Sequence, residues 1–276
     1  MRPILFSIGP VNIYGYGLMI ALGILVAFFV ASKRAPKYDL IPDAVYNIGL
    51  VAAVSGLLGA KILFCIVEFQ SFMADPVGIL FSGNGFVVFG GLISGVLVCL
   101  WYCKKKEYDF FRYFDLIMPS IALAQGFGRI GCFLAGCCYG AETESAFSVT
   151  FHASQLAPNG VKLIPTQLMS SAGDFLIAFI LIYMAKRIKR KGNIGALYIA
   201  LYSVGRFIIE FFRADYRGSI GPLSTSQAIS IVGVIVAAGF FVWNSKGQGN
   251  VVKGNSEEEA IDDVVLEDKE VTEDVD

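Results

Sequence analysis

Histidine and charge are both scarce in this chain of 276 residues. The one histidine, His152, leaves no support for a Ser/His/Asp triad or a histidine-ligated metal site. Charged residues make up 16% of the chain, against about 25% in soluble domains. The chain is instead 55% hydrophobic, with a mean hydropathy of +0.64. This composition excludes an ordinary soluble enzyme and indicates a membrane protein.

Long apolar runs recur along the chain, and each approaches the roughly 20 residues that a helix needs to span a bilayer. The first is not a cleaved signal peptide, because its basic residues Lys33 and Arg34 follow it and further runs come after it. We therefore expect an all-α polytopic membrane protein of seven transmembrane helices. The predicted spans are 13–31, 44–66, 86–103, 115–138, 168–184, 194–212 and 227–243.

Basic residues concentrate in alternate loops between these runs. The loops after the first, third and fifth runs hold 12 Lys and Arg residues, and the other loops hold 3. The positive-inside rule then places the N-terminus outside the cell and the C-terminus in the cytoplasm. The basic residues of the rich loops are Lys33, Arg34, Lys37, Lys104, Lys105, Lys106, Arg112, Lys186, Arg187, Lys189, Arg190 and Lys191.

The net charge of −1 conceals two parts of opposite sign. Residues 257–276 hold 11 of the 23 acids and one lysine, and no aromatic residue follows Trp243. Such a segment has too little apolar surface to fold. We expect a membrane domain over 1–243 and an acidic, disordered cytoplasmic tail over 244–276.

Four charged residues lie within the apolar runs: Lys61, Arg129, Arg206 and Glu210. Ionisable groups at membrane depth are costly, so a functional site is the first hypothesis. Tyr202, Arg206 and Glu210 are spaced four residues apart and share one face of a helix. Arg129 stands among glycines, where a forked guanidinium suits a phosphate. Structural ion pairs or snorkelling side chains remain open alternatives, above all for Lys61.

Tracing each span from its predicted outer end places these residues, with Tyr16, in the outer half of the membrane. This pattern indicates one cavity open to the outer leaflet, with an anionic lipid headgroup as its ligand. Asp174 lies early in its span, and either lines this cavity or faces interfacial water.

The six cysteines are mostly at membrane depth, where a thiol behaves as a small apolar group. Cys132, Cys137 and Cys138 lie near the predicted outer face. Their spacing does not match a zinc finger, which gives no support for a metal site. Redox chemistry of these thiols is an alternative.

With these residues in view, the chain resembles the prolipoprotein diacylglyceryl transferase family over about residues 3–243. The motifs match in order and spacing, and are specific as a set. They are Phe6-Ser-Ile-Gly-Pro10, Tyr16-Gly-Leu-Met19, Phe72-Met-Ala-Asp-Pro76, Gly90-Gly-Leu-Ile93, Gly128-Arg-Ile-Gly131, Pro165-Thr-Gln-Leu168 and Gly205-Arg-Phe-Ile-Ile-Glu-Phe-Phe-Arg213.

The resemblance implies a bacterial multi-pass protein of the plasma (inner) membrane. It implies transfer of diacylglyceryl from phosphatidylglycerol to the lipobox cysteine of a prolipoprotein as a thioether, with release of glycerol phosphate. It implies membrane lipids as further partners, and no cofactor, metal or nucleic acid. The catalytic residues it implies are Tyr16, Arg129, Tyr202, Arg206 and Glu210. The residues it implies for binding phosphatidylglycerol are Arg129, Arg206, Lys61, Gly140 and Gln167.

The chain departs from the family pattern at four positions. Phe89 stands in place of the family's histidine, and Cys132, Ala135 and Cys137 replace polar residues after the arginine. No general base is evident without the histidine. Two alternatives therefore stay open beside the transferase: a lipid-binding or transporter-like relative with altered chemistry, and a membrane thiol-redox protein.

Overall fold

The structure is a computed structural model that describes residues 4–8, 11–83, 85–152, 154, 156–214 and 218–246. Long helices dominate it, each lying within a few residues of a predicted span. They are α1 (Gly15–Arg34), α2 (Pro42–Val67), α5 (Val88–Lys105), α6 (Phe110–Ala135), α7 (Thr166–Met184), α8 (Asn193–Glu210) and α9 (Thr225–Lys246).

In the described part of the chain, 6 helices are long and apolar enough to cross a membrane. α8, which carries Arg206 and Glu210, is not among them. The all-α polytopic membrane fold is confirmed, while the number seven and the orientation stay predictions. The predicted acidic tail lies outside the described residues beyond its first few positions, and so does Arg217.

Short elements join the long helices, and the sequence did not predict them. The pairs of strands are all antiparallel, and in the first pair Ser7 stands opposite Asn12. The short elements are β1 (Ile4–Ile8) with β2 (Val11–Tyr14), a 3-10 helix (Ala35–Tyr38), α3 (Phe69–Ala74), α4 (Pro76–Phe81), β3 (Val149–Thr150) with β4 (Lys162–Leu163), and β5 (Ser219–Ile220) with β6 (Leu223–Ser224).

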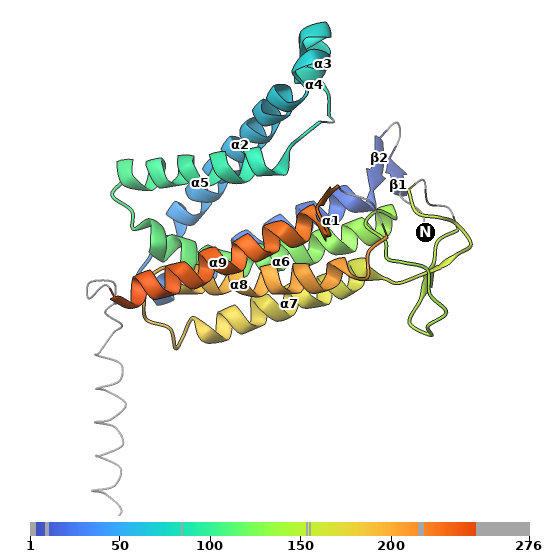
Figure 1. The fold of residues 1–276 in the computed structure, drawn as a ribbon. Helices are drawn as coiled ribbons and strands as arrows, with labels where there is room; N and C mark the ends of the chain where they lie inside the picture. Colours follow the sequence, from blue (N-terminus) through green and yellow to red (C-terminus); the bar gives the residue numbers. More distant parts are fainter. Residues whose placement is uncertain are drawn as a thin grey trace, which may run out of the picture.

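The helices form a bundle and a separate crossing pair (Figure 1). α1, α6, α7, α8 and α9 pack along one another, while α2 packs chiefly on α5. Glycines allow this crossing: a Cβ at Gly90 would lie 2.3 Å from the Gly59 carbonyl oxygen, and one at Gly91 would lie 2.8 Å from that of Gly56. Small residues let helix backbones approach closely where apolar burial cannot drive association.

One end of the bundle is held by contacts to backbone groups. The Asp115 carboxylate accepts hydrogen bonds from the Gly192 and Gly195 N–H groups at 2.6 and 2.8 Å, and so caps the start of α8. Near it, Lys191 pairs with Asp109 at 2.6 Å. A carboxylate at a helix N-terminus satisfies unpaired N–H groups and favours the helix dipole. This end also carries the basic loops of α1, α5 and α7.

The opposite end gathers the unusual polar residues. α1, α7 and α9 begin there, and α6 and α8 end there (Figure 1). The antiparallel order therefore brings Tyr16, Arg129 and Arg206 to one end, as the sequence predicts for a shared site.

Candidate functional site

Arg129 lies between a carboxylate and a phenol at this end of the bundle. Its Nε lies 3.9 Å from Asp174 Oδ2, and its Nη2 donates to the Tyr202 hydroxyl at 3.4 Å. Asp174 is 4% exposed, so it faces the site rather than interfacial water. Tyr202 stacks in turn on Tyr198, whose hydroxyl donates to Gln125 at 2.8 Å. Three helices, α6, α7 and α8, thus hold one guanidinium.

Arg206 forms the second guanidinium centre. Its Nη2 lies 2.9 Å from Glu210 Oε2 and donates to the Ser226 hydroxyl at 2.9 Å. The same Glu210 oxygen lies 3.8 Å from Arg213 Nε. The i, i+4 spacing on α8 correctly predicted the pair of Arg206 with Glu210. It gave no indication of Arg213 or Ser226, because these residues reach the pair through a bend and a neighbouring helix.

The two arginine centres lie close enough to interact. Asp174 interacts electrostatically with both Arg129 and Arg206, and the two guanidinium groups repel one another. Buried polar atoms without a hydrogen-bond partner in the described part of the chain include Arg206 Nη1 and Asp174 Oδ2. Buried polar atoms are nearly always paired, so unpaired ones in one place mark a site for a polar ligand.

Tyr16 packs against the helix that carries Arg129. A Cβ at Gly131 would lie 3.2 Å from the Tyr16 ring, so the glycine makes room for it. The phenol lies within electrostatic reach of Arg129 and of three thiols, those of Cys132, Cys137 and Cys138. Tyr16 therefore packs on the part of α6 that carries Arg129, and its catalytic role stays a prediction.

The cysteine segment lies at the end of α6, with Cys132 in the last turn and Cys137 and Cys138 just after it. The predicted span 115–138 is shifted here, because the helix begins at Phe110 and ends at Ala135. Gly136 is in the left-handed region at φ +74, where a glycine commonly ends a helix. Hydrogen bonds with the thiols of Cys132 and Cys138, together with burial, hold the pKa of the Cys137 thiol above its usual range.

Gln167 and Gly140 support this segment. Gln167 is 1% exposed, and its Nε2 donates to the Cys137 carbonyl at 2.8 Å, while its Oε1 is unpaired in the described residues. A Cβ at Gly140 would lie 2.6 Å from the Ile164 carbonyl oxygen and 2.7 Å from that of Phe212. Gly140 therefore ties the α6–α7 connection to the end of α8.

Lys61 and Phe89 belong to the crossing pair of α2 and α5. Lys61 is buried and donates to the Ser82 carbonyl and hydroxyl at 3.0 Å each, with its Nζ 4.7 Å from the Phe86 ring centroid. Phe89 is 44% exposed at the start of α5. The hydrogen bonds of Lys61 to Ser82 and its contact with Phe86 thus lie at the connection between α4 and α5, apart from the ion pairs of the arginines. Ala135, at the end of α6, and His152, exposed in the α6–α7 connection, take no part in these pairs.

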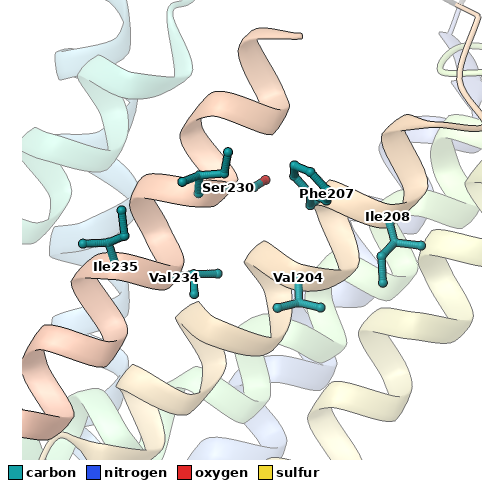
Figure 2. A pocket seen from close by; sticks show the side chains of 7 residues that line it. Val204, Phe207, Ile208, Ser230, Val234 and Ile235 are labelled. Atoms are coloured by element: carbon teal, nitrogen blue, oxygen red, sulfur yellow. The ribbon is translucent and has the colours of Figure 1, made fainter. Parts of the chain in front are cut away.

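An apolar groove runs between α8 and α9 (Figure 2). Its α8 wall includes Val204 and Phe207, which flank Arg206 in the sequence, and its α9 wall includes Val234 and Ile235. The helix that carries Arg206 therefore also lines an apolar groove. This combination is suited to a molecule with a charged head and a hydrocarbon body.

Comparison with known proteins gives consistent matches over the membrane region. Residues 3–243 match the family model described as prolipoprotein diacylglyceryl transferase. The phosphatidylglycerol–prolipoprotein diacylglyceryl transferase of Clostridium tetani is 46% identical over 88% of this chain and 97% of its own length. That of Clostridium perfringens designated 2 is 44% identical over 93% and 98%. That of Finegoldia magna is 35% identical over 85% and 92%.

Proposed function

We infer from its membership of the prolipoprotein diacylglyceryl transferase family, to which the chain belongs, that this protein is a bacterial multi-pass membrane transferase. It moves a diacylglyceryl group from phosphatidylglycerol to a prolipoprotein, the substrates in the names of its relatives. We propose that the acceptor is the lipobox cysteine. The observation that carries this assignment is the pair of arginine centres at one end of the bundle, together with an apolar groove lined by the helix that carries Arg206.

Arg129 and Arg206 would bind the phosphate of phosphatidylglycerol. Arg206 Nη1 is buried without a partner in the described residues, so it has a donor left for a phosphate oxygen. Negative charge on the phosphate rises as the carbon–oxygen bond to the glyceryl group breaks. Fixed guanidinium groups in a site shielded from water stabilise that charge in the transition state more than in the bound lipid.

The remaining residues of the site would position these two groups. Glu210 and Asp174 hold Arg206 and Arg129 at 2.9 and 3.9 Å. Tyr202 already accepts a hydrogen bond from Arg129 and keeps its own proton for a lipid oxygen. Tyr16 would stand beside the incoming thiol, and Gln167 and Gly140 would fix the segment that follows α6. An acyl chain would lie in the groove of Val204, Phe207 and Val234.

Lys61 would act at a distance from the phosphate. Its hydrogen bonds to Ser82 place it at the connection between α4 and α5. We propose that it holds this connection against the crossing pair, and that phosphate binding falls to the arginines. The catalytic unit would be residues 1–243, with the acidic tail outside it.

The test uses the purified full chain in phosphatidylglycerol vesicles with a synthetic lipobox peptide. The expected result is a mass increase of one diacylglyceryl group on the peptide and release of glycerol phosphate. Vesicles of phosphatidylethanolamine and a peptide with serine in place of the cysteine serve as controls. Transfer from phosphatidylethanolamine at an equal rate, or no transfer from phosphatidylglycerol, would contradict the assignment.

A further inference from the structure

Three thiols converge at the end of α6. The Sγ atoms of Cys132, Cys137 and Cys138 all lie within 4.8 Å of one another. Three thiolates on one tetrahedral zinc ion, at Zn–S distances near 2.3 Å, stand about 3.8 Å apart. Small rotations of the three side chains would therefore bring the sulfur atoms to the spacing found around a zinc ion. In the described part of the chain, no other group of three Cys, His, Asp or Glu meets the same distance criterion.

The end of the helix brings these thiols together. The Cys137 N–H donates to the Cys132 carbonyl at 3.1 Å, and the Gly136 N–H donates to the Phe133 carbonyl at 3.2 Å. These are the bonds of a Schellman motif, which folds the second residue after a helix over its last turn. In a continuing helix, Cys132 and Cys137 would point in different directions.

The neighbouring backbone holds Cys138 in an unusual conformation. Its φ of +61 lies in the left-handed region, which is strained for a residue other than glycine. The Cys138 carbonyl accepts a hydrogen bond from the Thr166 hydroxyl at 2.9 Å, and Thr166 is 1% exposed. Backbone strain maintained by buried polar contacts is characteristic of functional sites rather than of loose connections.

The thiols also adjoin the transferase site. Cys132 is three residues after Arg129 on α6, and both Cys132 and Cys138 lie within electrostatic reach of this arginine. Tyr16 lies within the same reach of all three thiols. Three protein ligands are the number found in catalytic zinc sites, which keep a fourth position for water or substrate.

We propose that Cys132, Cys137 and Cys138 bind a zinc-class cation, whose fourth position takes the thiol of the acceptor cysteine. This proposal rests on the proposed transferase function, since it assigns the activation of the acceptor. It also explains how the chain forms a thiolate with phenylalanine at position 89, where the family has histidine. The cation, rather than a protein base, stabilises the deprotonated sulfur.

The transfer step accounts for every bond, proton and electron pair. The acceptor thiol releases its proton to water as its sulfur binds the cation. That sulfur attacks the glyceryl carbon that carries the phosphate, and a carbon–sulfur bond forms as the carbon–oxygen bond breaks. The electron pair of the broken bond leaves on glycerol phosphate, whose added charge Arg129 and Arg206 stabilise. No oxidant or reductant is required.

The first measurement is metal content, which is independent of turnover. The full chain, purified in detergent under reducing conditions and loaded with Zn²⁺, is expected to retain one ion per chain after gel filtration. Cys132→Ser, Cys137→Ser and Cys138→Ser should each lose most of it. Cys65→Ser on α2 is the matched control and should retain it. Equal zinc in the wild type and in the triple serine variant would overturn the proposal.

The second measurement needs no variant, so it does not depend on the folding of the serine proteins. X-ray absorption of the zinc-loaded wild type is expected to show three sulfur ligands, and four after a lipobox peptide is added. A serine peptide should leave the count at three. No change with the cysteine peptide, or a disulfide among the three thiols in the reduced protein, would overturn the proposal. If the sulfur count rises but no lipid is transferred, the transferase assignment fails and the metal site stands.

Discussion

Arg206→Lys separates charge from geometry at the second arginine centre. One nitrogen of Arg206, Nη2, already contacts Glu210 Oε2 and the Ser226 hydroxyl at 2.9 Å each, while Nη1 is buried without a partner in the described residues. Lysine keeps the charge, but its three donors share a single nitrogen, which cannot occupy the positions of both Nη2 and Nη1. The change therefore removes one hydrogen bond between charged groups.

The magnitude follows from that one bond. A hydrogen bond to a charged group contributes about 1.5–3 kcal/mol, and about 1.36 kcal/mol corresponds to a tenfold rate change. Arg206→Lys is therefore expected to lower kcat/KM for lipobox peptide by about 10- to 160-fold. The assay is the initial rate of peptide mass shift in phosphatidylglycerol vesicles.

The matched control for this substitution is Arg190→Lys. Arg190 donates to the Asn244 carbonyl at 2.7 Å at the opposite end of the bundle, so the same exchange there should leave the rate unchanged. Glu210→Ala combined with Arg206→Ala should cost less than the product of the two single losses, because each single change strands the other charge. A wild-type rate for Arg206→Lys would refute recognition of phosphate by the guanidinium fork.

Three further predictions test other parts of the site and the fold. A cysteine placed at Glu144 should react with a membrane-impermeant maleimide added to intact cells, giving one label more than the unsubstituted chain. A cysteine placed at Lys106 should not react. The reverse result would invert the predicted orientation. Phe89→His should leave the transfer rate unchanged, and a gain in the same peptide assay would show that the wild-type chain lacks a needed base. Asp174→Asn should lower kcat/KM about tenfold, less than Glu210→Gln, because its ion pair is longer, at 3.9 against 2.9 Å; an equal or larger loss would make Asp174 more than a partner of Arg129.

Periodicity and composition predicted the helices, because length and hydropathy alone decide whether a segment can span a bilayer. They also predicted the pairing of Arg206 with Glu210, since residues four apart on one helix must meet. The contacts of Arg129 with Asp174 and Tyr202 join three helices, and no pattern within one helix encodes such contacts. Ser226 was missed for the same reason.

The sequence around the cysteines contains a signal for the helix end that brings them together. The linear spacing of Cys132, Cys137 and Cys138 does not match a zinc finger and by itself gives no support for a metal site. Gly136, however, is a helix-ending residue placed four after Cys132 and one before Cys137. A helix end at this glycine predicts that the two flanking cysteines meet. The predicted span to 138 does not indicate this contact, because it continues the helix across the turn at Gly136.

The contrast between the two ends of the bundle has a consequence for how such a protein tolerates change during evolution. The Asp115 carboxylate bonds to main-chain N–H groups of α8, which every amino acid except proline supplies. The opposite end depends on particular side chains meeting across helices, as Arg206 meets Ser226. The Gly192 and Gly195 positions themselves still require glycine, because Gly192 has φ +84 and a Cβ at Gly195 would lie 2.0 Å from the Phe114 ring. Sequence drift at this end is therefore limited by space for a side chain, whereas drift at the arginine end must occur in compensating pairs. Relatives that take up a different acceptor would be expected to differ in coordinated sets at one end and to keep the same scaffold at the other.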